Sequence, residues 1–226
     1  MRIRKKKWAE PELKSVSYYI EEPTQHKGHW RDLYAQKAPL WLEIGCGKGN
    51  FVAQMALENP NVNFVAVDIK IDMLGVAKRN IESMFAQANR TPDNIRLTVF
   101  NVEKALTVFD EQDKIERMFI NFCNPWPKPK DKKHRLTHSR QLEIYKNFLV
   151  KGGEIWFKTD DDQLFKESQR YFDECGFTIR YITEDLHKSD FDGSSPATEH
   201  ERMFTEQGIP TKFLIAVCPR KTEQEQ

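Results

Sequence analysis

Seven short runs of apolar and β-branched residues are spread along the chain from residue 40 onward. Most of them are continuously hydrophobic, which is typical of strands that are covered on both faces. Such strands occur mainly in parallel sheets with helices on each side. We therefore predict strands at residues 40–44, 64–68, 95–100, 118–122, 155–159, 177–182 and 213–218.

Segments with apolar residues three and four positions apart lie between several of these runs and predict helices. Residues 71–88, 142–149 and 164–175 have this spacing. Gly152-Gly153 and Gly176 follow the last two segments and suit helix ends. Alternating strands and helices predict a doubly wound α/β fold, with a mostly parallel, seven-stranded Rossmann-like sheet and helices on both faces.

The polar segment before the first predicted strand shows no sustained period. We interpret residues 1–39 as a basic N-terminal arm with one short helix near Trp30 to Tyr34. Residues 40–220 would form a single domain, and residues 221–226 a flexible polar tail. A chain of 226 residues is long enough to bury a full core of this kind.

Positive charge is concentrated in two segments, although the net charge of the chain is only +1. One cluster occupies residues 2–7. Segregation of this kind indicates a polyanionic partner, while a solvated surface is the plainer alternative for either cluster alone. The second cluster consists of Lys128, Lys130, Lys132, Lys133, Arg135 and Arg140.

The four cysteines are scattered and form no C-x-x-C pair, so we expect neither a zinc site nor a disulfide framework. His134 and His138 lie four residues apart but have no evident third ligand, and we expect no metal. No apolar stretch is long enough to span a membrane, and the first eight residues do not resemble a signal peptide. We predict a soluble, cytoplasmic protein.

The first predicted strand runs directly into a glycine-rich loop, LEIGCGKGN. Glycines at positions 45, 47 and 49 allow a tight turn and a close approach of the backbone to a ligand. Asp68 ends the next predicted strand about 20 residues further on, where a carboxylate can accept hydrogen bonds from ribose hydroxyls. Together these features predict a site for a nucleoside cofactor.

Two residues in this loop favour one cofactor over another. The dinucleotide fingerprint has a third glycine where this chain has Asn50. Glu43 would repel a pyrophosphate but suits a ligand that carries an ammonium and a sulfonium. The pattern Glu43-x-Gly45-x-Gly47-x-Gly49 is similar to motif I of class I S-adenosylmethionine methyltransferases, in which Glu103 would then meet the adenine edge. We therefore predict S-adenosylmethionine rather than NAD.

The stretch Asn124-Pro125-Trp126-Pro127 directly follows the fourth predicted strand. Its prolines stiffen the loop, which would overhang the cofactor and present the face of Trp126. A structural turn is the simpler alternative. The adjoining basic cluster favours a nucleic acid, because phosphate neutralisation beside an aromatic ring is how flipped or single-stranded bases are held.

Five motifs in order, LEIGCGKG, NPWPKP, HRLTH, FKTD and TEHERMF, resemble the bacterial tRNA (guanine-N7-)-methyltransferase family from the basic amino terminus to about Pro219. The resemblance implies transfer of a methyl group from S-adenosylmethionine to N7 of guanosine 46 in the tRNA variable loop. It implies that Glu43, Asp68, Glu103 and Asn124 meet the cofactor. It also implies that the guanosine is held by Lys128, Asp160, Thr198, Glu199, His200 and Glu201.

The basic residues beside the Asn-Pro-Trp segment would contact tRNA phosphates. The clearest candidates are Lys130, Lys132, Lys133 and Arg135, together with the Arg2–Lys7 segment. Helix capping is a rival interpretation for Thr198 with Glu201, which match a capping box, and for Asp161 or Asp162. Residues 194–197 are interpreted as a mobile lid, and the oligomeric state is expected to be a monomer or a homodimer.

One position departs from the family, which usually has Asp where this chain has Asn124, at the catalytic position. Guanine N7 has an in-plane lone pair and needs no general base, so we expect a slower enzyme rather than an inactive one. Two alternatives stay open. Asn-Pro-Trp also resembles the signature of exocyclic-amine methyltransferases acting on nucleic acid or protein, and the missing carboxylate is compatible with a catalytically impaired tRNA-binding module.

Overall fold

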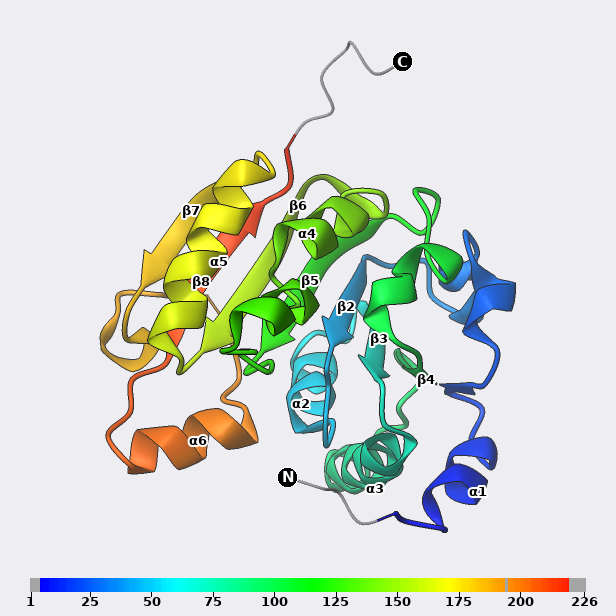
Figure 1. Cartoon of the computed structure of the whole chain (residues 1–226). Coiled ribbons are helices and arrows are strands. Elements are labelled where there is room, and N and C mark those ends of the chain that lie inside the picture. The colour runs from blue at the N-terminus through cyan, green and yellow to red at the C-terminus, as the bar shows by residue number, and fades with distance from the viewer. Residues whose placement is uncertain (1–4, 194, 220–226) are drawn as a thin grey trace.

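The computed structural model of the chain describes residues 5–193 and 195–219, which form one sheet flanked by helices (Figure 1). The sheet order is β1-β4-β3-β2-β5-β6-β8-β7. All neighbouring pairs from β1 to β6 are parallel, and β8 runs antiparallel to both β6 and β7. The strands are β1 (Tyr19–Ile20), β2 (Leu40–Ile44), β3 (Asn63–Asp68), β4 (Ile95–Val99), β5 (Ile115–Asn121), β6 (Leu149–Thr159), β7 (Thr178–Thr183) and β8 (Lys212–Val217).

The predicted fold class is confirmed, with one strand more than expected. The additional strand is β1, which has two residues and pairs in parallel with the edge strand β4. A strand this short carries no hydrophobic period of its own, so its sequence could not reveal it. The seven predicted strands are all present, and six of them lie within a few residues of their predicted bounds. The strand predicted at 155–159 is longer, because β6 begins at Leu149.

Helices cover both faces of the sheet. The α-helices are α1 (Ala9–Lys14), α2 (Asn50–Glu58), α3 (Ile71–Gln87), α4 (Ser139–Tyr145), α5 (Asp162–Glu174) and α6 (Glu199–Glu206). Short 3₁₀ helices are η1 (Pro23–His26), η2 (Trp30–Leu33), η3 (Val102–Thr107), η4 (Pro129–His134) and η5 (Leu186–Lys188). One hydrophobic cluster joins the sheet to α4, α5 and η2, and a second joins it to α1, α2 and α3.

The predicted helix at residues 142–149 is too long. The observed helix α4 ends at Tyr145, and the chain enters β6 at Leu149. Gly152-Gly153 therefore lies inside a strand, at an irregularity where the pairing of β5 with β6 shifts register. Gly152 has a positive φ of 78°, which a bulge needs as much as a helix end does. The glycines correctly indicated a turn of the backbone, but the prediction that they end a helix was wrong, because they lie in β6.

Residues 5–39 do not form a separate arm. Trp30 is fully buried, and its Nε1 donates to the carbonyl of Val108 at 2.9 Å. Tyr34 is also buried and donates to the carbonyl of Phe64 at 2.7 Å. The predicted short helix in this region is present as η2. Arg2 and Arg4 of the basic segment, and the predicted tail at 221–226, lie outside the described residues.

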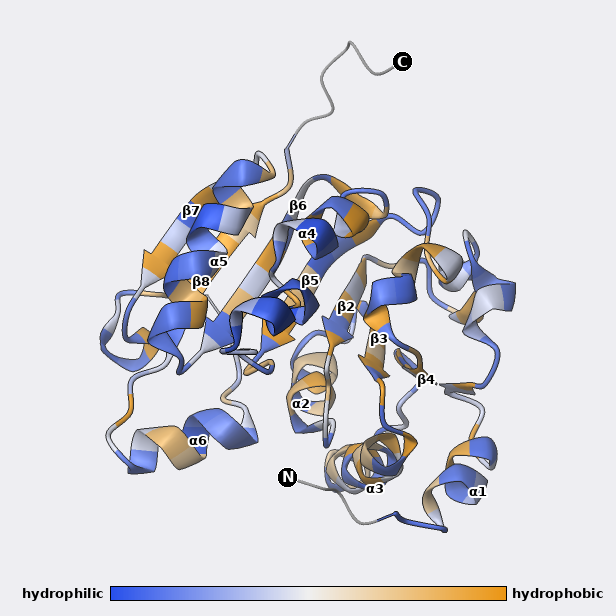
Figure 2. Cartoon of the chain, in the orientation of Figure 1, coloured by the Kyte–Doolittle hydropathy of each residue, from blue (hydrophilic) through white to orange (hydrophobic). Residues whose placement is uncertain are grey.

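Hydrophobic residues concentrate on the central strands, while α6 and the outward turns of α5 are mostly hydrophilic (Figure 2). Within the described part of the chain, no helix combines the length and apolar character needed to cross a bilayer. The carboxyl ends of the parallel strands converge near α2, α6 and the loop after β5, and this edge holds the candidate site.

Candidate functional site

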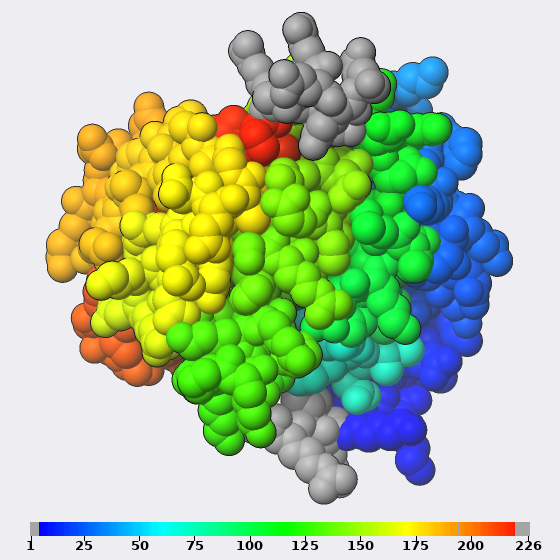
Figure 3. Space-filling model, turned by 45° about the horizontal axis from the view of Figure 1, so that its top comes forward, coloured from blue at the N-terminus to red at the C-terminus, as the bar shows by residue number. Residues whose placement is uncertain are grey.

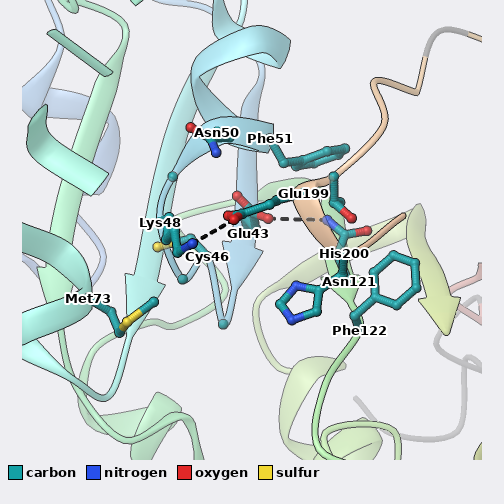
Figure 4. A pocket seen from close by; sticks show the side chains of 14 residues that line it. Glu43, Cys46, Lys48, Asn50, Phe51, Met73, Asn121, Phe122, Glu199 and His200 are labelled. Atoms are coloured by element: carbon teal, nitrogen blue, oxygen red, sulfur yellow. Dashed lines mark hydrogen bonds and ion pairs between the residues drawn. The ribbon is translucent and has the colours of Figure 1, made fainter. Parts of the chain in front are cut away.

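A pocket lies at the carboxyl end of β2 and β5, between the glycine loop and α6 (Figure 4). Ligands of open α/β sheets bind at this edge. The lining brings together several residues that the sequence singled out, from segments about 150 residues apart. It consists of Glu43, Gly45, Cys46, Gly47, Lys48, Gly49, Asn50, Phe51, Met73, Asn121, Phe122, Thr198, Glu199 and His200.

The glycine loop is shaped by backbone hydrogen bonds and by three positive φ angles. The amides of Gly45 and Cys46 both donate to the carbonyl of Val67, at 2.8 and 2.9 Å. Gly45, Gly47 and Gly49 have φ of 77°, 54° and 73°, a region that favours glycine. At Gly49 a Cβ would also lie 2.7 Å from the Cβ of Ala77, so close packing of the loop on α3 excludes a side chain.

Glu43 lies at the base of the pocket with a half-satisfied carboxylate. Its side chain is 2 % exposed, and its Oε1 accepts a hydrogen bond from Asn121 at 3.1 Å (Figure 4). Its Oε2 is buried and has no hydrogen-bond partner among the residues that the structure describes. Burial raises the pKa of Glu43 to about 8, against the opposing effect of the Asn121 hydrogen bond. A buried acceptor without a donor is suited to a positively charged group of a ligand.

The opposite wall of the pocket is the first turn of α6. Thr198 caps this helix, and together with Glu201 it forms the predicted capping box. Glu199 is exposed and its Oε1 lies 2.6 Å from Nζ of Lys48 in the glycine loop (Figure 4). The His200 ring stacks on Phe122 at a centroid distance of 6.0 Å. The contact between His200 and Phe122 places α6 beside the loop after β5.

Glu201 does not face the pocket, although it was predicted to hold the substrate. Its side chain is 1 % exposed, and both carboxylate oxygens are engaged. Oε2 lies 2.9 Å from Nζ of Lys158 in β6, and Oε1 lies 3.2 Å from Nε2 of His187. Glu201 therefore caps the helix, as the alternative interpretation proposed. Within the Thr198–Glu201 motif, Glu199 and His200 are the residues whose side chains are exposed.

Asp68 and Glu103, the other two predicted cofactor acids, lie outside the pocket lining. The Oδ2 of Asp68 accepts from the amide of Gly47 at 3.0 Å, so this carboxylate also holds the glycine loop. Glu103 lies in the first turn of η3, and its Oε1 lies 2.7 Å from Nδ1 of His134 in the basic segment. Asp68 thus borders the site directly, whereas Glu103 connects it to the basic segment.

Asn124 is exposed and is not among the residues that line the pocket. Its Oδ1 accepts a hydrogen bond from the amide of Trp126 at 3.0 Å, which stabilises the turn of the Asn-Pro-Trp segment. Phe122 and Trp126, on either side, have positive φ angles of 48° and 41°. Such angles are rare and costly for bulky residues and cluster at functional sites. The Trp126 ring packs against His134, at a centroid distance of 5.5 Å.

The basic cluster is divided into exposed and paired residues. Lys128, Lys130 and Lys133 are exposed. The segment around η4 is the green part of the chain that protrudes at the lower edge of Figure 3. Lys132 forms an ion pair with Glu167 of α5 at 2.6 Å. Arg135 is fully buried, where it pairs with Glu167 and donates to the carbonyl of Pro125 at 2.6 Å. The prediction that Arg135 contacts phosphates is therefore wrong for this structure.

The Arg135 pair instead fixes the base of the basic segment. Burial would raise the pKa of Glu167, but hydrogen bonds from Lys132, Gln163 and Arg135 together lower it to about 2. The resulting carboxylate ties the segment to α5 at neutral pH. Sequence reasoning could not distinguish this arginine from its neighbours, because burial depends on how α5 packs.

At the end of β6, two adjacent aspartates have different environments. Asp161 caps α5 by accepting from the amide of Leu164 at 2.6 Å, as expected for Asp161 or Asp162. Asp160 is half-buried, and its backbone carbonyl accepts from Lys212 at 3.2 Å. No cluster of three potential metal ligands is found among the described residues.

Several residues of the site were not identified from the sequence. Asn121 binds Glu43, Phe51 and Met73 supply apolar lining, and Lys158 binds Glu201. A lysine inside the apolar run IWFKT was the available signal for Lys158, because buried lysines are rare unless paired. Of the predicted lid, Ser194 lies outside the described residues, and the Pro196 carbonyl accepts from Lys158 at 3.3 Å.

Solved structures with similar folds include methyltransferases of low sequence identity. The 16S rRNA methyltransferase KamB aligns with a TM-score of 0.60 at 12% identity, over 85% of this chain and 93% of that chain. A precorrin-6y C5,15-methyltransferase from Geobacter metallireducens aligns with a TM-score of 0.53 at 13% identity, over 82% of each chain. These similarities establish the fold alone.

Sequence comparison is more specific. Residues 37–214 match the protein family described as "Putative methyltransferase". A tRNA (guanine-N(7)-)-methyltransferase of Clostridium botulinum (strain Alaska E43 / Type E3) is 56% identical over 96% of this chain and 99% of its own length. The protein of the same name from Clostridium perfringens (strain 13 / Type A) is 51% identical, with the same coverage. The chain therefore belongs to the tRNA (guanine-N(7)-)-methyltransferase family.

Proposed function

We propose that this protein transfers a methyl group from S-adenosylmethionine to N7 of a guanosine in tRNA. The observation that carries the proposal is identity above 50% to proteins of that name over nearly the full chain, combined with the pocket at the glycine loop. Following the family resemblance, we propose guanosine 46 of the variable loop as the target. The cytoplasmic location and the monomeric or dimeric state stay predictions.

The pocket fits the cofactor. S-adenosylmethionine, when bound, supplies an electrophilic methyl group on a positively charged sulfur. The Oε2 of Glu43, buried without a hydrogen-bond partner in the described part of the chain, would accept from its ammonium group. A Cβ added at Gly45 or Gly47 would come no closer than 3.9 Å to another atom, so the backbone of the loop leaves room for a ligand. Asp68 would accept from the ribose hydroxyls and Glu103 from the adenine edge.

The chain's own residues would act by positioning and electrostatics. Guanine N7 carries a free lone pair, so no residue has to remove a proton before transfer. Positive charge develops on the base, and an oxygen near it lowers the barrier. Asn124 supplies an amide carbonyl for this purpose, with a weaker field than a carboxylate. Lys128 and Asp160, together with the first turn of α6, would hold the guanosine.

Guanine specificity would come from the exposed part of the Thr198–Glu201 motif. The donor edge of guanine presents N1–H and the 2-amino group, which a carboxylate can accept from. Glu199 is exposed at the pocket, and it would leave Lys48 to meet the base. Glu201 is buried and already paired. We therefore assign base recognition to Glu199 and His200 and not to Glu201.

The test is methylation of bulk unmodified tRNA with labelled S-adenosylmethionine, followed by nuclease digestion and mass spectrometry. We expect 7-methylguanosine from the variable loop. Asn124→Asp is expected to raise the single-turnover rate about 10–1,000-fold, because a carboxylate adds field while it keeps the hydrogen bond to Trp126. A methylated exocyclic amine would favour the second enzyme class. Salt-dependent tRNA binding with no product from wild type would identify a binding module.

A further inference from the structure

Lys158 and Glu201 form an ion pair that is removed from solvent on both sides. Each side chain is 1 % exposed, and the two charged groups lie 2.9 Å apart. Lys158 also donates to the carbonyl of Pro196 at 3.3 Å, which leads directly into α6. The pair thus joins the carboxyl end of a central strand to a helix that is about 40 residues later in the chain.

This pair is the main internal attachment of α6. Among the eight residues of the helix, Glu201 is the one that is buried. Glu201 also contacts His187, whose Nε2 lies 3.2 Å from Oε1. The remaining polar attachments lie at the surface: Lys48 with Glu199, and Arg202 with Gln54 at 3.5 Å. Phe122 adds ring contacts to His200 and Phe204 on the half-exposed side. The helix is therefore not anchored by an apolar face, as most surface helices are.

A buried ion pair fixes the relative position of two elements more readily than it stabilises the fold. Desolvation of both charges offsets most of their attraction, and replacing a pair by uncharged groups is often neutral. Hydrogen bonds between the two groups are directional, whereas apolar contacts are not. At this position a defined geometry matters, because the residues next to Glu201 form one wall of the pocket.

The capping box connects the Glu201 carboxylate to the wall of the pocket. Oε2 of Glu201 accepts from the amide of Thr198 at 3.2 Å, and the Thr198 hydroxyl accepts from the amide of Glu201 at 3.0 Å. Thr198 therefore cannot shift without disturbing the ion pair. Glu199 and His200 follow directly and carry the exposed groups of this wall.

We propose that Lys158 is a positioning residue for methyl transfer: by holding Glu201, it sets the position of the 198–200 turn relative to the glycine loop. This inference rests on the proposed function, because the turn is assigned to the guanosine. Lys158 does not touch the reacting atoms. Lys158 would act by fixing the distance between the base and the methyl donor. The rate of transfer depends strongly on this distance, since misplacement by about 1 Å can lower a rate 10²-fold.

The test compares single and double substitutions. Lys158→Met leaves the buried Glu201 carboxylate without its lysine partner and with His187 as its remaining charged contact, so we expect a lower Tm and impaired folding. Lys158→Met combined with Glu201→Gln removes both charges and keeps an acceptor for the Thr198 amide. We expect this double variant to recover the Tm and to bind S-adenosylmethionine within tenfold of wild type, while kcat falls about 100-fold. If the role of Lys158 were purely structural, kcat would recover together with the Tm.

A matched control is Lys78→Met combined with Glu82→Gln. This pair has a Nζ–Oε2 distance of 2.8 Å and a Lys78 side chain that is 11% exposed, and neither residue is among those that line the pocket. We expect wild-type kcat from the control. Wild-type kcat from the Lys158/Glu201 double variant would overturn the proposal.

Hydrogen exchange provides a readout that does not depend on activity. We expect faster exchange of the amides at residues 199–206 in the Lys158/Glu201 double variant and not in the control. Unchanged exchange would overturn the positioning role even if no substrate were turned over. If wild type makes no 7-methylguanosine but the exchange difference is present, the proposed function fails while the anchoring of α6 stands.

Discussion

The two walls of the pocket are held in different ways. The glycine-loop wall continues into α2, which buries Phe51, Val52, Ala53, Met55 and Ala56 in the core. The α6 wall buries one residue, and that residue is a charged partner of Lys158. Apolar packing makes the first wall rigid. The second wall keeps a defined position through directional contacts and has little apolar area to lose when it moves.

The basic segment resembles the α6 wall more than the glycine wall. None of the residues of η4 is buried, and the segment is fixed at its end by buried Arg135 and its ion pair with Glu167. Both segments that would meet the tRNA are therefore attached by ion pairs, the basic segment to α5 and the α6 wall to β6. The segment assigned to the cofactor is attached by hydrophobic packing. Substitutions can separate these two kinds of attachment.

The largest effect is expected at Gly49. A Cβ would contact Ala77 at 2.7 Å and require a positive φ, so Gly49→Ala should lower the free energy of unfolding by about 3 kcal/mol. The control is Gly208→Ala, just after α6, where φ is 73° but no atom lies within 4 Å. Strain alone should cost about 1 kcal/mol there. Urea unfolding measures both, and equal losses would contradict tight packing of the glycine wall.

The second effect is expected at Arg135. Arg135→Ala removes a buried guanidinium from Glu167 and the Pro125 carbonyl, and should cost about 2 kcal/mol of unfolding free energy. Lys133→Ala, on the exposed side of the same segment, should leave stability unchanged. It should instead reduce the salt dependence of tRNA binding by about one phosphate contact. If Lys133→Ala lowered stability and Arg135→Ala reduced the salt dependence of tRNA binding, Arg135 would be a phosphate contact after all.

The third effect concerns pH. Burial raises the pKa of Glu43 to about 8, so in the free protein its carboxyl is largely protonated at neutral pH. A cationic ligand favours the carboxylate, so binding must displace the proton below pH 8. Affinity for S-adenosylmethionine should therefore weaken by up to about tenfold per pH unit as the pH falls below 8. Calorimetry should detect this, and Glu43→Gln should bind weakly without this dependence.

The same group affects stability with the opposite trend. The folded pKa lies above the unfolded value, so the folded state keeps a proton that the unfolded state releases between about pH 4.5 and 8. The contribution of Glu43 to stability is thus fully present at low pH and is lost as pH rises to 8. The Tm of wild type without ligand should fall across this range more than that of Glu43→Gln. Parallel curves would contradict the raised pKa.

The smallest effect is expected at Lys48. Its ion pair with Glu199 joins the two walls at the surface, with side chains 47% and 51% exposed. Surface pairs contribute about 0–1 kcal/mol, so Lys48→Ala should change the Tm little and alter kcat/KM by less than about fivefold. A loss of kcat as large as that expected for the Lys158/Glu201 double variant would show that the surface pair, and not the buried one, positions α6.

The sequence was most informative where a structural feature depends on neighbouring residues. The glycine loop after β2, the acid at the end of β3, the capping box at Thr198 and the cap at Asp161 were all predicted and are present. Each of them is a contact within a few residues or a conformation that one residue type permits. The sequence was misleading at Gly152-Gly153, because a glycine that permits a positive φ suits both a helix end and a strand bulge.

By itself, the sequence determined the α/β class, the positions of the main strands along the chain, the loop that a cofactor can approach and the family to which the chain belongs. Only the tertiary structure decided which charged residues are buried. Arg135, Lys158 and Glu201 look like their exposed neighbours in the sequence, yet each is covered by an element far away in the chain. Burial decides whether a charge binds a ligand or positions the protein, and long-range packing sets it.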